Sequence, residues 1–259
     1  MNNVKLSQRL GLLLEQIPHG SKLADIGSDH ALLPLAAVQT GRAVSAVAGE
    51  VNPGPHRAAE KAVQDAGLND RISVRRGDGL EVLQPEEADC ITIAGMGGAL
   101  IASILNRGNM EGKLAAVRTL VLQPNVGEDI LRRWLLDNGW VLTAEALLEE
   151  DGKRYEVLTA VLEDTATGLT NEGLYADAAR AGGERPYSME TLLHMGPWLI
   201  RQKGPVFVAK WQDEISKLER ILESLSRSEL ESAESKRTEI TARIREITEV
   251  LACLPKDKP

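Results

Sequence analysis

Residues 22–37, KLADIGSDHALLPLAA, decide the fold, because they join a short apolar run to a glycine turn and then to a stretch that can begin a helix. Strand, glycine turn and helix in this order begin many nucleotide-binding sheets. The common dinucleotide fingerprint is G-x-G-x-x-G, but this turn offers Gly27 followed by Asp29 and His30. A pyrophosphate prefers bare backbone amides at a helix end, and Asp29 would repel it. The turn therefore disfavours a dinucleotide.

Apolar runs and helical stretches alternate along the first half of the chain. An amphipathic helix comes first, marked by apolar residues from Leu6 to Ile17. The alternation that follows indicates βαβ units and a parallel sheet. The expected strands lie at 22–26, 43–48, 72–75, 88–94 and 119–122, and the expected helices lie at about 30–40, 53–66, 97–106 and 127–138.

The pattern changes at residues 139–164, where two extended runs flank Asp151-Gly152, a hairpin turn signal. A parallel sheet that ends in an antiparallel hairpin is the layout of class I methyltransferases, although a flanking hairpin can decorate other α/β domains. We therefore predict an α/β fold: a Rossmann-like class I methyltransferase sheet with a terminal antiparallel hairpin, formed by residues 1–163.

Residues 164–259 are expected to form a helical domain with a coiled coil at about 205–253. Apolar residues share one helical face from Trp211 to Leu225, and the pattern resumes from Ile240 to Leu251. The stretch 226–237 between them is polar. An antiparallel pair of helices explains this polar stretch, and one long helix exposed in its middle is the alternative.

Composition and charge narrow the class of protein. The chain has 259 residues, is 43% hydrophobic and carries a net charge of −8, which argues against coating nucleic acid through a basic surface but leaves room for a local basic patch. Cys90 and Cys253 are far apart, and the four histidines show no ligand spacing, so no disulfide framework or metal site is expected. The first residues fit neither a signal peptide nor a membrane span. We predict a cytoplasmic monomer without a metal.

Polar residues and glycines follow each expected strand, at the edge where open α/β sheets bind ligands. A carboxylate after the second strand can accept both ribose hydroxyls, one after the third can accept an adenine amine, and the first loop can hold an amino group. Ribose, adenine and an amino acid together indicate S-adenosylmethionine. Singly, each acid has a plainer reading as a cap, a solvated loop residue or a turn residue. The residues are Asp25, Gly27 and Asp29, then Glu50, then Asp78 and Gly79, then Gly95 to Gly98, and finally Gln123 to Asn125.

Five segments, DIGSDHALLP, GEVNPGP, RRGDGL, IAGMGG and LQPN, in this order and spacing resemble the bacterial tRNA (adenine(22)-N1)-methyltransferases. The resemblance runs from residue 5 to about residue 250. It implies a Rossmann-like domain with a C-terminal coiled coil, S-adenosyl-L-methionine as methyl donor, and tRNA as substrate. One departure is Leu32, where that family often has tyrosine.

Site residues are carried over to the matching positions of this chain. By motif, the resemblance places Asp25, Gly27, Glu50, Asp78, Gly79 and Gly95 in the cofactor site. It places Met96 and Gly97 where the target base and the methyl group meet. We also expect Asn125, Lys5 and Arg9 to bind the substrate. Further candidate phosphate contacts are Arg132–Arg133, Lys153–Arg154 and Arg201–Lys203.

The loop A-G-M-G-G lacks the asparagine and aromatic residue that usually grip an adenine N6 amine, so it favours methylation at N1. N1 attack relies mainly on positioning, and a carboxylate would stabilise the cationic product and accept a proton. Asp29 and His30 are the nearest catalytic candidates, and a helix cap is the alternative for Asp29. A methyltransferase for another RNA or a small molecule, or a non-catalytic RNA-binding protein with a relic pocket, also remains open.

Overall fold

The computed structural model describes residues 4–226 and 231–252. The chain forms two compact units, one ending at Leu174 and the other beginning at Tyr175, so the division falls within α6 (Asn171–Arg180). The boundary predicted from sequence, between residues 163 and 164, lies in the loop before α6.

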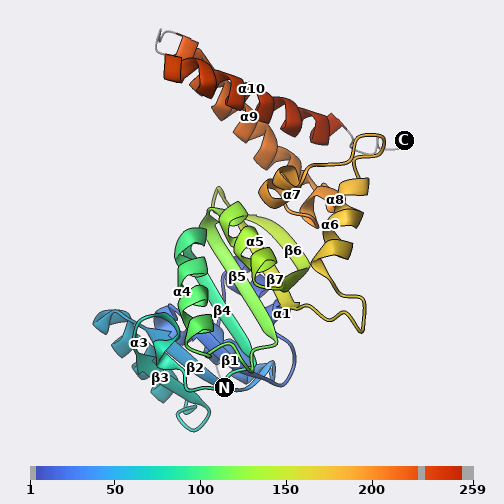
Figure 1. Cartoon of the computed structure of the whole chain (residues 1–259). Coiled ribbons are helices and arrows are strands. Elements are labelled where there is room, and N and C mark those ends of the chain that lie inside the picture. Colours follow the sequence, from blue (N-terminus) through green and yellow to red (C-terminus); the bar gives the residue numbers. More distant parts are fainter. Residues whose placement is uncertain (1–3, 227–230, 253–259) are drawn as a thin grey trace, which may run out of the picture. The chain divides into compact units, whose positions relative to one another are not determined.

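The first unit is built on a seven-stranded sheet in the order β3-β2-β1-β4-β5-β7-β6 (Figure 1). The first five strands pair in parallel, and β7 runs antiparallel to both β5 and β6. The predicted α/β sheet with a terminal hairpin is confirmed. The strands are β1 (Ser21–Ile26), β2 (Ala43–Glu50), β3 (Ile72–Arg76), β4 (Cys90–Gly97), β5 (Thr119–Val126), β6 (Trp140–Glu150) and β7 (Lys153–Leu162).

Helices cover both faces of this sheet. On one face, α1, α2 and α3 share a core with the strands, in which Leu13, Leu33 and Val63 are buried. On the other, α4 and α5 pack side by side over β4 and β5 (Figure 1). The helices are α1 (Gln8–Gln16), α2 (Leu32–Gln39), α3 (Pro53–Asp65), α4 (Gly98–Met110) and α5 (Glu128–Asp137), with short 3-10 turns η1 (Asp29–Ala31) and η2 (Gly79–Val82).

Strands β4 and β5 each run farther than the sequence predicts, to Gly97 and Val126. Register shifts on either side of Met96 let β4 pass through the glycine-rich loop while still paired with β5. A Cβ on Gly98 would lie 2.0 Å from the carbonyl oxygen of Gly127, so only glycine allows the two turns to approach this closely. The glycine loop is therefore held rigidly at the carboxyl edge of the sheet.

Arg132 does not lie where a phosphate contact would have to be, contrary to the expectation from sequence. It is fully buried on α5 and donates to Glu145 Oε1 at 2.6 Å and to Glu156 on the terminal hairpin. A guanidinium inside the fold cannot contact tRNA phosphates, so that expectation is wrong for Arg132. Its neighbour Arg133 is exposed.

The second unit is helical. Helices α9 and α10 are separate and pack against one another, rather than forming one long helix. Trp211 and Leu218 on one helix, and Ile240 and Ile247 on the other, are buried. Because α10 already begins inside the polar stretch predicted to separate the helices, that stretch is partly helical. Coiled-coil packing stays a prediction, and Cys253 lies outside the described residues. The helices are α7 (Met189–Met195), α8 (Leu199–Gln202), α9 (Pro205–Ser226) and α10 (Glu231–Ala252).

Candidate active site

A cavity of about 580 Å³ opens at the carboxyl ends of the parallel strands. Its volume lies in the range of small-molecule sites. It brings together residues that are far apart in the sequence but that end neighbouring strands. Of the residues predicted from sequence, the lining includes Arg9, Asp25, Gly27, Asp29, Glu50, Asp78, Gly79, Gly95 and Met96.

Asp25 at the end of β1 is a buried carboxylate. Its Oδ1 accepts a hydrogen bond of 2.6 Å from Thr92 Oγ1. Burial raises the pKa of Asp25, while the hydroxyls of Ser28 and Thr92 and the positive charge of Arg9 oppose that rise. A buried acid with a raised pKa is well placed to bind a cationic group, because the ligand would supply the missing counter-charge.

Glu50 at the end of β2 is also buried, with 7% of its surface exposed. Its Oε1 accepts from the backbone nitrogen of Asn52 at 2.8 Å and from Asn52 Nδ2 at 3.0 Å. Its Oε2 accepts no hydrogen bond from any described residue. One oxygen thus orients the carboxylate and the other is open to a ligand.

Asp78 after β3 is more exposed than Asp25 or Glu50, and it forms an ion pair with Arg107 on α4. Arg107 Nη2 lies 3.0 Å from Asp78 Oδ2 and donates to the Asp78 carbonyl at 3.2 Å. Gly79 follows in the left-handed region at φ +58°. Arg107 is not predicted from sequence, because a single arginine on a helix does not indicate which loop its side chain contacts.

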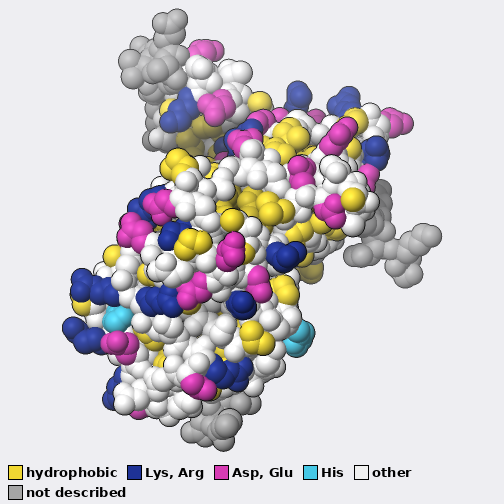
Figure 2. Space-filling view, turned by 60° about the horizontal axis from the view of Figure 1, so that its bottom comes forward, with side chains coloured by type: hydrophobic (Ala, Val, Ile, Leu, Met, Phe, Trp, Pro, Cys, Tyr) yellow, Lys and Arg dark blue, Asp and Glu magenta, His cyan; other side chains and the backbone are white. Residues whose placement is uncertain are grey.

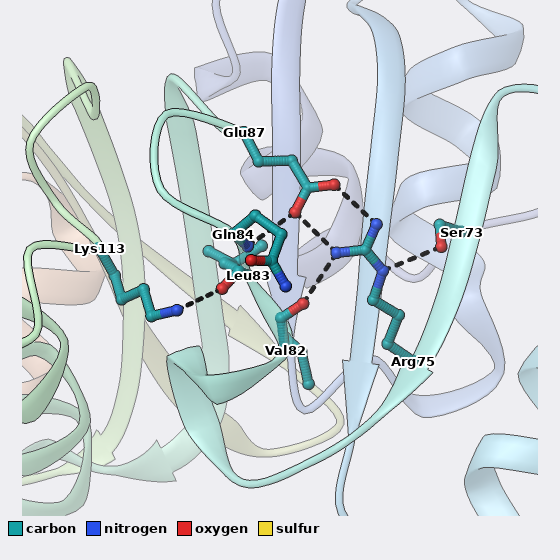
Figure 3. A network of polar contacts seen from close by, with 7 residues as sticks. All are labelled: Ser73, Arg75, Val82, Leu83, Gln84, Glu87 and Lys113. Carbon is teal, nitrogen blue, oxygen red and sulfur yellow. Dashed lines mark hydrogen bonds and ion pairs between the residues drawn. The ribbon is translucent and has the colours of Figure 1, made fainter.

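A polar network holds the chain that follows Asp78 and Gly79 (Figure 3). Arg75 on β3 makes a bidentate pair with Glu87, at 2.6 Å for each bond, and donates to the Val82 carbonyl at 2.9 Å. Lys113 Nζ donates to the Leu83 carbonyl at 2.6 Å. Because bidentate arginine pairs fix geometry, this network fixes the end of η2 and thereby supports the cavity loop before it.

The turn between β1 and α2, residues 27–31, has a strained backbone. His30 and Ala31 both have left-handed backbones, at φ +56° and φ +52°, so α2 begins only at Leu32. Two consecutive left-handed residues other than glycine are costly and cluster at functional sites. The strain keeps Asp29 at the cavity instead of in the first turn of α2.

Asp29 does not cap α2. The residue at the N-cap position is Ala31, and no side chain caps the helix. The Asp29 carboxylate is 73% exposed and lies 3.3 Å from His30 Nε2. His30, which is 57% exposed, does not line the cavity. This placement leaves Asp29 as the better catalytic candidate of the two.

Several glycines line the cavity. Gly27 has φ +75°, and a Cβ there would lie 2.4 Å from Met96 Cε. Gly95 has φ +79°. Any larger residue at Gly27 would strain the backbone and displace Met96, which would narrow the cavity.

The predicted substrate residues do not all lie together. Arg9 lines the cavity, where its Nη1 donates to Gln123 Oε1 at 2.7 Å. Asn125 is exposed and is not part of the lining, and it donates from Nδ2 to the Gly95 carbonyl at 2.8 Å. Gly97 pairs with Val126 and is not part of the lining, and Lys5 is exposed away from the cavity. Their roles toward a substrate stay predictions.

Charge on the surface is mixed. On the face drawn in Figure 2, Lys and Arg side chains lie among Asp and Glu side chains without forming a field of one sign. Within the described ranges, no group of His, Cys, Asp and Glu could hold a metal ion. The helices of the same ranges include none that is long and apolar enough to cross a membrane.

The strand order, the terminal hairpin and the cavity lined by four carboxylates and several glycines define a Rossmann-like, S-adenosylmethionine-dependent methyltransferase. Within that class, the chain belongs to the tRNA (adenine(22)-N(1))-methyltransferase family, whose model matches residues 23–249. The resemblance seen in the sequence is thereby confirmed.

Individual relatives agree over nearly the whole chain. The tRNA (adenine(22)-N(1))-methyltransferase of Bacillus subtilis is 44% identical over 97% of this chain and 99% of its own length. The crystal structure of the B. subtilis M1A22 tRNA methyltransferase TrmK superposes with a TM-score of 0.85 at 42% identity, covering 95% of this chain and 99% of that one. A Streptococcus pneumoniae protein solved with S-adenosyl-L-methionine has a TM-score of 0.78 at 40% identity, covering 95% and 100% of the two chains.

Proposed function

We propose that this chain transfers a methyl group from S-adenosyl-L-methionine to N1 of adenine 22 in tRNA. The observation that carries the proposal is the cavity that gathers Asp25, Glu50 and Asp78 over the Gly27 turn, in a chain that belongs to this family. When bound, the donor supplies an electrophilic methyl group on a positively charged sulfur.

The donor fits the chemistry of the cavity. Asp25 would hold the ammonium of its amino acid part, since a buried acid gains most from an opposite charge. The open oxygen of Glu50 would accept the ribose hydroxyls. Asp78 and Gly79 would border the adenine. The absence of a side chain on Gly27 leaves room for the donor beside the backbone.

Asp29 is the residue that we assign to the reaction itself. Methylation at N1 makes the adenine cationic, and the product then loses a proton from N6. The Asp29 carboxylate at the cavity would stabilise that charge and accept the proton. Its freedom from a capping role supports this assignment.

The helical unit would orient the tRNA. No acidic residue occurs between Glu190 and Asp213, whereas this stretch carries Arg201, Lys203 and Lys210. Such a local excess of positive charge suits phosphate contacts on an otherwise acidic protein. Adenine 22 in folded tRNA is not freely exposed, so the base would have to be flipped out before reaction. The cytoplasmic location and monomeric state stay predictions.

The test is methylation of two tRNA transcripts that differ only at position 22, adenine in one and guanine in the other. With labelled donor, nucleoside mass spectrometry should find N1-methyladenosine in the first transcript and no methylated base in the second. Methylation at N6, or equal labelling of both transcripts, would refute the assigned position. A protein that binds the donor but labels no RNA would favour a small-molecule substrate, and one that binds no donor would indicate a relic pocket.

A further inference from the structure

Gln123 links α1 to the glycine loop through a chain of hydrogen bonds. It lies near the end of β5 and is fully buried. Its Oε1 accepts from Arg9 Nη1 at 2.7 Å. Its Nε2 donates to Asn125 Oδ1 at 3.1 Å, and Asn125 Nδ2 donates in turn to the Gly95 carbonyl at 2.8 Å.

The direction of this chain follows from its first member. A guanidinium can only donate, so Arg9 must face the oxygen of the Gln123 amide. The Gln123 nitrogen must then face Asn125, which must accept through oxygen and therefore point its nitrogen at Gly95. An inverted amide at either position would set two donors or two acceptors against each other. Arg9, together with the Pro124 carbonyl that accepts from Gln123 Nε2 at 2.8 Å, thus fixes the direction of both amides toward the Gly95 carbonyl.

Both ends of the chain lie at the cavity. Arg9 and Gly95 line it, whereas Gln123 has no exposed surface and cannot touch a ligand. Arg9 is held in place by the face of the Tyr155 ring, whose centroid lies 5.4 Å from Cζ, and by its backbone nitrogen, which donates to Glu150 Oε2 at 3.3 Å. Arg9 is therefore positioned by α1 and by the terminal hairpin, and the hydrogen bonds that begin at Arg9 end on the loop after β4.

We propose that Gln123 is a positioning residue that transmits the hydrogen-bond direction of Arg9 to the Gly95–Gly97 loop and so fixes where the target base is held. The proposal rests on the proposed function, because that function places the target base at this loop. Gly95 has a left-handed backbone at φ +79°, which a small rotation of its carbonyl would disturb. Since methylation at N1 depends on alignment, an error in this loop should slow the reaction without weakening donor binding.

The decisive variant is Gln123→Glu in the full-length protein. Glutamate has the same shape and still accepts from Arg9, but it cannot donate to Asn125 or to the Pro124 carbonyl, which Gln123 Nε2 reaches at 2.8 Å. With adenine-22 tRNA and saturating donor, kcat should fall on the order of 10–100-fold, the scale of a small misalignment. The KM for the donor should stay near that of the wild type. The melting temperature should fall, because the buried carboxylate oxygen faces two acceptors, so kcat is measured well below the melting temperature of the variant. A merely structural role would lower stability and leave kcat of the folded protein unchanged.

Asn125→Asp breaks the next bond of the relay and should reproduce the same split between kcat and the donor KM. Asn138→Asp is the matched control, because Asn138 Nδ2 also donates to a backbone carbonyl, that of Trp134 at 2.8 Å, but at the C-cap of α5 and outside the cavity lining. It introduces the same charge and should leave kcat unchanged.

Normal kcat in both relay variants, or an equal loss in the control, would overturn the proposal. Wild-type protein that methylates adenine 22 in the same assay separates this failure from a failure of the proposed function.

Discussion

The two halves of the cavity differ in how they would hold a ligand. The carboxylate half lies at the ends of β1, β2 and β3, where Asp25, Glu50 and Asp78 line the cavity. The amide half lies at the ends of β4 and β5, where Gly95 and Met96 line the cavity and the amides Gln123 and Asn125 hold their loop from outside the lining. Charge suits a donor that is itself cationic, because opposite charges attract even when the fit is loose. A backbone loop held by fixed amides suits a neutral base that must be aligned. The difference suggests that binding and alignment are supplied by separate parts of one site.

Asp29, between these halves, should show the largest effect. Asp29→Asn keeps the shape of the side chain and removes its charge. With saturating donor, the single-turnover rate on tRNA should fall on the order of 10²–10⁴-fold, the scale for a positioned base. Rapid-quench measurement of methylated tRNA gives this rate, and Asp70→Asn, an exposed acid before β3, is the control. A near-normal rate would remove Asp29 from the chemistry and move the proton acceptor elsewhere.

Asp25 should make donor affinity depend on pH. Its pKa is raised by burial, so as the pH falls through that raised value the carboxylate is neutralised and the donor should bind more weakly, by up to about tenfold per pH unit. The protein without donor should show the opposite trend. Because the folded state binds the proton more tightly than the unfolded state, this group adds stability as the pH falls through the same window. Calorimetry of donor binding against pH, with Asp25→Asn expected to bind weakly and without this dependence, tests the pair of trends. Affinity that is flat with pH in the wild type would contradict them.

Asp78 should show the smallest effect of the three. Its side chain is 58% exposed and already paired with Arg107, so solvent and the arginine both screen its charge. Asp78→Asn should raise the donor dissociation constant by about two- to fivefold, the range of exposed ion pairs. Fluorescence titration with the donor measures it. A loss of donor affinity larger than that of Asp25→Asn would show that the adenine end, and not the amino acid end, dominates donor binding.

The sequence predicts the carboxylate half of the site more completely than it predicts the amide half. Asp25, Glu50 and Asp78 each follow an apolar run, and the topology of a parallel sheet brings such positions to one edge. The sequence predicts ends for β4 and β5 that come too early, because glycines and proline, which are uncommon inside strands, occupy the last residues of both. The left-handed residues His30 and Ala31 delayed the start of α2, since neither residue type signals that conformation.

The sequence does not predict the contacts between segments that are far apart along the chain. Gln123 meets Arg9 across 114 residues of sequence, and its direction depends on how α1 packs. From sequence, Arg132 is expected to be a surface cation like its neighbour Arg133. In the structure it pairs with Glu145 and Glu156 on the hairpin that follows. A buried ion pair of this kind appears in sequence as ordinary scattered charge, because burial is a property of the folded chain.

Calorimetric titration of S-adenosyl-L-methionine into Glu50→Gln and Asp29→Asn side by side tests most directly whether donor binding and the reaction depend on separate residues. Glutamine at position 50 can keep both bonds from Asn52 through its oxygen, but it replaces the open carboxylate oxygen with an amide nitrogen, which cannot accept from a ribose hydroxyl. The account predicts that Glu50→Gln weakens donor binding on the order of 10–100-fold, the loss of charged hydrogen bonds, while Asp29→Asn binds the donor as the wild type does. Unchanged affinity in a folded Glu50→Gln protein, or equal weakening in both variants, would contradict it.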